Sequence, residues 1–155
     1  MNREENLRKG LVEPFYVARD GYGILSIYKE KPIKSITNDI VFWKGKGMFI
    51  DKTLFPEVKE NYLYIETIKD KNINEFDFFK CFRGYNHVAK NKDNTLYIFE
   101  DKPLRFPKYW GACFGLRIES FLCKNMKYTN TKPIHIVVKE LSHNKINHAN
   151  NQKQH

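Results

Sequence analysis

The sequence predicts a mainly β (α+β) protein, made of two tandem, similar antiparallel β units with little helix. Three observations support this prediction. The chain of 155 residues repeats an 18-residue segment, short runs of β-branched and aromatic residues alternate with turn residues, and helix signals are few. Its 41% of hydrophobic and 29% of charged residues are typical of a chain that folds around a core.

The internal repeat is the most informative feature of the chain. Residues 17–34 (VARDGYGILSIYKEKPIK) align without a gap with residues 88–105 (VAKNKDNTLYIFEDKPLR); six of the 18 positions are identical and six more are conservative. The only two tryptophans, Trp43 and Trp110, then each precede two glycines and a short apolar stretch that ends in an acid. We interpret this pattern as a tandem duplication. Two copies are too few for a solenoid, so we expect a paired domain with a pseudo-twofold axis.

The repeat also sets the expected domain organisation. The first β unit covers residues 1–71, and the second unit, its duplicate, covers residues 72–141. Residues 142–155 are rich in Asn, Gln, His and Lys, with Ile146 as the only sizeable apolar side chain. Because such a segment buries too little apolar surface to offset its ordering entropy, we expect a disordered polar tail.

Two short segments fit helices. Residues 2–9 fit one helix, but Leu7 is nearly its only apolar residue, so this helix has little to pack. Residues 74–84 (NEFDFFKCFRG) fit either a helix with Phe76 and Phe79 on one face or an alternating strand. We predict a helix there that bridges the two units.

Each unit is expected to begin its sheet with a hairpin. In the first unit, the β-rich runs 15–19 and 24–28 are separated by a turn that contains two glycines. In the second unit, the turn 91–94 consists of Asn, Lys and Asp and precedes the run 95–99. Both faces of residues 95–99 are apolar or aromatic, which predicts a strand inside a sheet rather than at its edge.

Two further strands complete each unit. We expect the third strands at residues 48–51 and 116–118 and the fourth strands at residues 62–68 and 134–139. A proline breaks the run 51–58, which predicts a single helical turn or a loop.

The first unit also resembles a known group of proteins. It contains Tyr-Val-Ala-Arg-Asp at 16–20, Leu-x-Ile-Tyr at 25–28, Lys-Pro-Ile-Lys at 31–34, a Trp at 43, and Ile-Asp-x-x-Leu-Phe-Pro-Glu-Val at 50–58. This pattern is similar to that of short uncharacterised proteins of gut Bacteroidetes and their phages, here in tandem duplicate. The resemblance implies no activity. It implies a phage or mobile-element gene whose product works in the bacterial host cytoplasm.

The formal net charge of +9 favours a nucleic-acid partner at first sight. However, only six of the 27 basic residues are Arg, and Arg makes bidentate contacts to phosphate and guanine that Lys cannot make. The chain is also rich in Ile and Asn, as AT-rich codons would make it, so composition explains much of the charge. No apolar run is long enough to span a membrane, and no signal peptide is recognisable, so we expect no membrane partner.

Motifs for catalysis, cofactors and metals are missing from the sequence. Cys81, Cys113 and Cys123 form no CxxC pair, no serine lies in a nucleophile elbow, and no glycine-rich nucleotide motif is present. Residues 44–47 (Lys-Gly-Lys-Gly) could hold a phosphate, but their counterpart 111–115 has no lysine, so we interpret them as an ordinary loop. We therefore expect no enzyme, no cofactor and no metal site.

Three basic positions are matched between the units and flank each hairpin. Together with the two tryptophans they form the set of candidate binding residues: Arg19, Lys31, Lys34, Trp43, Lys90, Lys102, Arg105 and Trp110. Ordinary roles compete with this hypothesis, because such lysines often only improve solubility, and Arg19 could pair with Asp20 or Glu30. Tryptophans are also more often core residues than stacking platforms for bases.

The function we expect is that of a non-catalytic binding protein of phage or mobile-element origin. It would bind a host protein or a small ligand in the groove between the units, for example to counter a host defence. The alternatives are a nucleic-acid-binding protein that uses a basic face and a structural, virion-associated subunit. The sequence determines neither the partner nor the oligomeric state.

Overall fold

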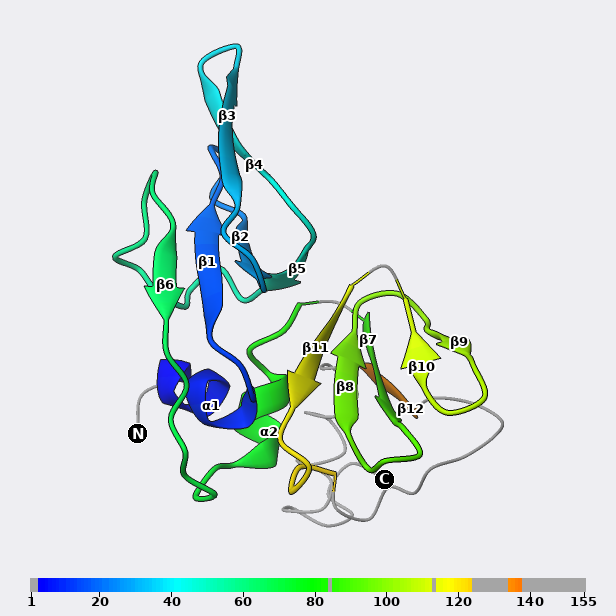
Figure 1. Cartoon of the computed structure of the whole chain (residues 1–155). Helices are drawn as coiled ribbons and strands as arrows, with labels where there is room; N and C mark the ends of the chain where they lie inside the picture. Colours follow the sequence, from blue (N-terminus) through cyan, green and yellow to red (C-terminus); the bar gives the residue numbers. More distant parts are fainter. Residues whose placement is uncertain (1–2, 84, 113, 124–133, 138–155) are drawn as a thin grey trace, which may run out of the picture.

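The computed structural model describes residues 3–83, 85–112, 114–123 and 134–137. Most of the regular structure in these residues is antiparallel β, accompanied by two short helices, which confirms the predicted mainly β class (Figure 1). The expected disordered tail, residues 142–155, lies outside the described part of the chain.

In the described residues, each half of the chain contains one helix followed by six strands. The elements of the first half are α1 (Arg3–Gly10), β1 (Phe15–Arg19), β2 (Leu25–Tyr28), β3 (Ile33–Thr37), β4 (Ile40–Lys44), β5 (Gly47–Ile50) and β6 (Leu63–Ile65). The elements of the second half are α2 (Glu75–Phe79), β7 (Tyr85–Lys90), β8 (Leu96–Phe99), β9 (Leu104–Arg105), β10 (Trp110–Gly111), β11 (Gly115–Ile118) and β12 (Ile134–Val137).

Two four-stranded antiparallel sheets form the body of the protein. Their strand orders are β5-β2-β1-β6 and β11-β8-β7-β12, so each half arranges its fifth, second, first and sixth strands in the same order. The remaining strands form two separate hairpins, β3–β4 and β9–β10. In Figure 1, the β3–β4 hairpin projects from one end of the molecule, whereas β9–β10 lies beside the second sheet.

The pairing register of the central strands also coincides in the two halves. Val17 of β1 lies opposite Ile27 of β2, and Val88 of β7 lies opposite Ile98 of β8. Both residues of the second pair are 71 positions after their counterparts in the first pair. The predicted position of residues 95–99 inside a sheet is confirmed, because β8 lies between β11 and β7.

The two tryptophans occupy matching positions in the small hairpins. Lys34 lies opposite Trp43 in β3–β4, and Arg105 lies opposite Trp110 in β9–β10. Equal strand order and equal register are what a duplicated unit would produce. The duplication itself stays a prediction.

The segment that precedes each sheet crosses to the sheet of the other half. Leu11 forms a bridge with Ile118 of β11, and Phe82 forms a bridge with Ile50 of β5. One backbone hydrogen bond of 2.7 Å strengthens each crossing; the N–H groups of Glu119 and Asp51 donate to the carbonyls of Gly10 and Cys81, respectively. The halves are therefore joined by reciprocal backbone pairing as well as by side-chain packing.

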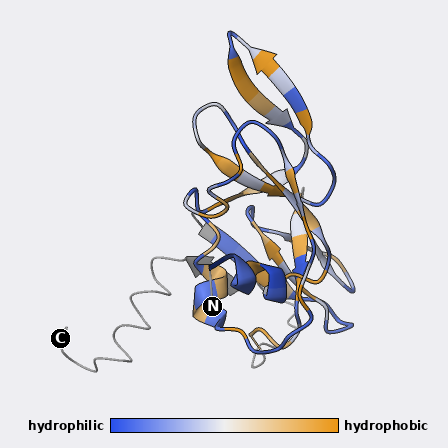
Figure 2. Cartoon of the chain, turned by 90° about the vertical axis from the view of Figure 1, so that its left-hand side faces the viewer, coloured by the Kyte–Doolittle hydropathy of each residue, from blue (hydrophilic) through white to orange (hydrophobic). Residues whose placement is uncertain are grey.

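Both halves contribute to one hydrophobic core. The inner faces of the two sheets, both helices and the segment 54–58 pack into a single cluster of buried side chains. Figure 2 shows hydrophobic residues along the strands of this body and also on the β3–β4 hairpin, where Ile33 and Ile36 are exposed. The boundary expected near residues 71 and 72 thus separates two sheets that share a core.

Both helices differ from their predictions in what they bury. Leu7 of α1 is fully buried, so the expectation that this helix has little to pack was wrong. α2 is shorter than the predicted 74–84, and it buries Phe78 and Phe79 rather than Phe76. The reason is tertiary, because α1 and α2 pack against each other and both contribute side chains to the shared core.

Candidate functional site

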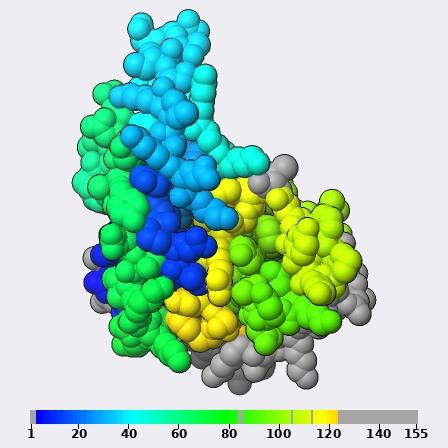
Figure 3. All heavy atoms as spheres, in the orientation of Figure 1, coloured from blue at the N-terminus to red at the C-terminus, as the bar shows by residue number. Residues whose placement is uncertain are grey.

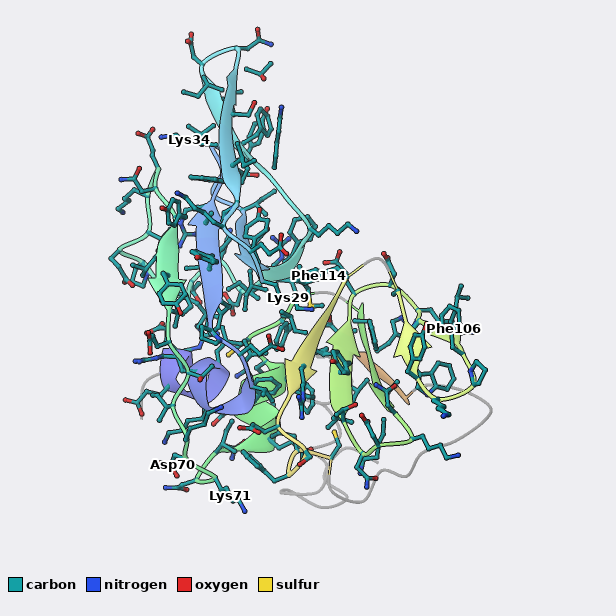
Figure 4. The ribbon with its side chains drawn as sticks, viewed as in Figure 1. Lys29, Lys34, Asp70, Lys71, Phe106 and Phe114 are labelled. Carbon is teal, nitrogen blue, oxygen red and sulfur yellow. The ribbon has the colours of Figure 1, made fainter. Side chains whose placement is uncertain are left out.

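A cleft of about 810 Å³ lies between the two sheets. One wall comes from two loops of the first half, residues 29–33 and 44–46, and the other comes from β8 and the region around β10 in the second half. Figure 3 shows the surface hollowed where the cyan part of the first half faces the yellow and green second half. Lys29 and Phe114, which both line the cleft, lie close together at this junction in Figure 4.

The wall from the first half is basic. It contains one acid, Glu30, and four exposed lysines, Lys29, Lys31, Lys44 and Lys46. Gly45 lies where the two loops approach each other: a Cβ added there would lie 3.5 Å from Tyr28 and 3.8 Å from Pro32. Its φ of 145° also favours glycine. In the described part of the chain, none of the four lysines forms an ion pair. The Lys31 ammonium lies over the ring of Tyr62, 5.2 Å from its centroid, so the charges of Lys29, Lys44 and Lys46 are the ones available to an anion.

The wall from the second half is aromatic. Tyr97 and Phe99 of β8 stack with ring centroids 6.1 Å apart and an interplanar angle of 23°. Trp110 is only 5% exposed and packs with Phe99 and Ala89 in a small second core. Tyr109 is 50% exposed and lines the cleft. This wall thus combines one solvent-accessible ring, that of Tyr109, with the buried ring of Trp110.

The buried Asn91 fixes the β9–β10 hairpin beside the second sheet. Its side-chain oxygen accepts a hydrogen bond of 2.7 Å from the backbone N–H of Trp110, and its amide nitrogen donates to Thr95 Oγ1 at 3.0 Å. The backbone N–H of Lys92 also donates to the carbonyl of Lys108 at 3.1 Å. β9 and β10 each contain only two residues, so their strand pairing gives few hydrogen bonds. The hydrogen bonds of Asn91 and Lys92 therefore contribute more than this pairing to the position of the hairpin.

Arg19, the first candidate binding residue, has a structural role instead. Its guanidinium donates hydrogen bonds of 2.9–3.2 Å to five backbone carbonyls, those of Gly23, Lys52, Leu54, Phe55 and Val58. The described contacts include no pairing of Arg19 with Asp20 or Glu30, and Arg19 does not line the cleft. Trp43 belongs to the same structural region, because its indole N–H donates to the Arg19 carbonyl at 2.8 Å.

Of the seven candidate residues whose side chains the structure describes, Lys31 and Trp110 line the cleft. Lys34 lies on the projecting hairpin, away from the junction (Figure 4). Two more candidates lie outside the cleft lining, the half-buried Lys90 and the exposed Lys102. The backbone of Arg105 is placed opposite Trp110 in β9.

Sequence reasoning missed most of the cleft. The unpredicted lining residues with chemical character are Lys29, Lys44, Lys46, Tyr97 and Tyr109. One signal was available: residues 44–47 were considered as a phosphate-binding loop and interpreted as an ordinary loop, yet two of their lysines line the cleft.

The matched acids and the cysteines do not suggest a second site. Asp51 bonds to side chains of its own half, and Glu119 lies 3.9 Å from Lys69, so the two acids form no carboxylate pair. Burial raises the pKa of the Cys81 thiol to about 12. Among the residues that the structure describes, no group of three His, Cys, Asp or Glu side chains could hold a metal ion.

Asp51 provides a testable pH dependence. Its partial burial alone would raise its pKa, but hydrogen bonds from Thr53 N (2.9 Å), Thr53 Oγ1 (2.7 Å) and Arg3 (2.7 Å) outweigh that effect and lower the pKa. A depressed pKa stabilises the folded state above the unfolded pKa, and this contribution disappears as pH falls through the folded value. Asp51→Asn should therefore lower the free energy of unfolding by about 1 kcal/mol at pH 7, given partial solvent screening.

Urea unfolding at several pH values tests this prediction. The difference between Asp51→Asn and the natural chain should shrink between about pH 5 and pH 2, where the carboxylate becomes protonated. Asp101→Asn, at an exposed position, is the matched control and should change stability by less than about 0.5 kcal/mol. A difference that stays constant with pH would contradict the assignment.

Comparison of the chain with protein-family models, with curated proteins and with solved structures found no match. Among the described residues, neither helix has the length and apolar character needed to cross a membrane. The cleft is therefore the feature of the described residues that points to a function.

Proposed function

We propose that this chain is a non-catalytic binding protein of phage or mobile-element origin, and that a small anionic ligand binds in the cleft between its sheets. The observation that supports this proposal is the pairing of a wall with four exposed lysines, none of them in an ion pair with a described residue, and a wall of aromatic rings. The volume of about 810 Å³ is within the range of pockets for small molecules, roughly 300–1,000 Å³. The proposed origin rests on the sequence resemblance, which also implies that the protein works in a bacterial host cytoplasm.

The chemistry of the lining favours binding over catalysis. The described residues around the cleft include no Ser, Thr, Cys, His or Asp side chain, and Glu30 is their only carboxylate. The described lining therefore contains no Ser–His or Cys–His pair of the kind that acyl transfer uses. Lysines and aromatic rings can still give affinity through charge and stacking.

A thermal-shift experiment on the full chain tests this function. Sodium pyrophosphate, sodium citrate and adenosine monophosphate (AMP) serve as probes at low ionic strength. A ligand at ten times its Kd stabilises the native state by RT ln 11, which raises Tm by about 4 °C for a chain of this size. At least one of the three anions should produce such a shift.

Matched variants locate the binding. Lys29→Gln/Lys44→Gln/Lys46→Gln should abolish the shift, whereas Lys34→Gln/Lys71→Gln, which neutralises exposed lysines outside the cleft, should retain it. If none of the probes raises Tm, or if the cleft variant keeps the full shift, the proposed function is wrong.

A second candidate function is nucleic-acid binding, favoured by the net charge of +9. Binding that depends on phosphate contacts along a duplex loses affinity steeply between about 50 and 200 mM salt. Fluorescence anisotropy with a labelled 20-base-pair DNA separates the two functions. Tight, salt-sensitive duplex binding that survives the cleft variant would favour the nucleic-acid function over the small-ligand function.

A further inference from the structure

A second, smaller hollow adjoins the cleft. Its volume is about 390 Å³, and it shares the lining residues Asn91 and Tyr109 with the main cleft. Two more exposed lysines line it, Lys92 and Lys108. Its one acid, Asp93, accepts hydrogen bonds from Thr95 N (3.0 Å) and Thr95 Oγ1 (2.6 Å). Two adjoining hollows, each with exposed lysines, therefore meet at Tyr109.

Tyr109 lines both hollows, so each group of lysines shares a hollow with its ring. Phe106 stacks on it with ring centroids 4.8 Å apart and planes only 14° apart. Tyr109 nevertheless remains 50% exposed. One face of the ring is thus supported by another aromatic side chain, while the exposed part can stack on a planar ligand.

From this arrangement we infer that the ligand contains a nucleobase with phosphate groups on both sides of it. This inference rests on the proposed function and specifies its ligand class. The base would stack on Tyr109, one phosphate would meet the lysines of the main cleft, and the next would meet Lys92 and Lys108. The same chemistry occurs in a free dinucleotide and in a single strand of DNA or RNA.

The magnitudes agree with this ligand class. Stacking of one base on an aromatic side chain contributes about tenfold or more in affinity, and lysines bind phosphate as point charges. Each additional phosphate contact adds a salt-dependent gain. The polar side chain between the two hollows, Asn91, already uses both its oxygen and its amide nitrogen within the protein. We therefore expect recognition with little preference among bases.

Isothermal titration calorimetry on the full chain tests the inference at 50 mM NaCl. The probes are AMP, 5′-phosphorylated diadenylate, its thymidine counterpart and a ten-residue deoxyadenylate strand. Diadenylate should bind at least tenfold more tightly than AMP, and the thymidine dinucleotide should bind within about fivefold of diadenylate.

Variants separate the two sides of the site. Lys92→Gln/Lys108→Gln keeps the backbone hydrogen bond between these residues, and it should reduce diadenylate affinity to nearly that of AMP without changing AMP binding. Tyr109→Leu should weaken both ligands about tenfold. Lys34→Gln/Lys71→Gln serves as the control for net charge and should leave all affinities within twofold.

The outcomes distinguish this inference from the proposed function. Equal affinity for AMP and diadenylate, or no effect of Lys92→Gln/Lys108→Gln, would overturn the inference and leave a single-anion site. Binding of pyrophosphate or citrate in the thermal-shift experiment, without any nucleotide binding, would have the same meaning. If the ten-residue strand binds no more tightly than diadenylate, the source of the ligand is a free dinucleotide. A further gain with strand length identifies a single-stranded nucleic acid.

Discussion

Arg19→Ala should lower the free energy of unfolding by about 3 kcal/mol, because it removes every donor of a guanidinium that binds five carbonyls. Four of these carbonyls belong to the irregular segment 52–58, which has no strand partner of its own. The same segment buries Leu54, Phe55 and Val58 in the core. Without Arg19, buried carbonyls lose their partners and the position of three core side chains is no longer fixed.

Arg19→Lys shows whether geometry or charge matters. Lysine is the residue at the matching position in the second half, Lys90, but its ammonium group has no planar fork that could reach carbonyls on several sides. We expect Arg19→Lys to lose about 2 kcal/mol. Urea unfolding followed by circular dichroism measures both variants, and Lys102→Ala is the control for an exposed base. Stability within 0.5 kcal/mol of the natural chain for Arg19→Ala would contradict this role.

Most of the fold could be predicted because the strands of the main sheets follow local rules. Runs of apolar residues bounded by turn residues identified the four strands of each sheet, and the repeat indicated which strands correspond. The turn prediction at 91–94 is confirmed by Asn94, which has a φ of 71° where the first half has Gly23 at 84°.

The β3–β4 hairpin was missed, although it has a recognisable turn. Asn38 and Asp39 have φ values of 53° and 62°, as a two-residue hairpin turn requires, and both residue types tolerate this region. The flanking strands, IKSIT and IVFWK, do not alternate polar and apolar residues, and Ile33 and Ile36 face solvent. A search for strands that bury one face in the core gives such a hairpin little weight.

The cleft could not be predicted for a different reason. The repeat selects positions that are alike in both halves, whereas the cleft combines unlike positions. Lys29 aligns with Glu100, and Tyr97 aligns with Ser26, so the basic wall and the aromatic wall each exist in one half only. Only the way in which the sheets pack brings these two walls together, and no local pattern in the sequence encodes that packing.

That packing depends on one close contact between the helices. A Cβ added at Gly10 would lie 2.2 Å from Cδ1 of Phe78, which is shorter than any tolerated contact. Phe78 is fully buried and is held by edge-to-face contacts with Phe79 (5.1 Å) and Phe82 (5.4 Å), so its ring has no room to move. Gly10→Ala should therefore destabilise the protein by about 3 kcal/mol.

The sign of this effect makes the prediction decisive. Helix propensity alone would make Ala more stable than Gly by about 1 kcal/mol in α1, the opposite direction.

Phe78→Ala removes the clashing ring and should itself cost about 4 kcal/mol through the cavity it leaves. If the clash is the cause, the two losses in free energy of unfolding are not additive. The double variant Gly10→Ala/Phe78→Ala should then lose at least 1 kcal/mol less than the summed losses of the two single variants. Gly111→Ala is the control, because its Cβ would meet two exposed rings at ordinary or slightly short distances, Phe106 at 3.3 Å and Tyr109 at 3.5 Å. Additive losses, or a stabilised Gly10→Ala, would mean that the helices do not pack at this distance.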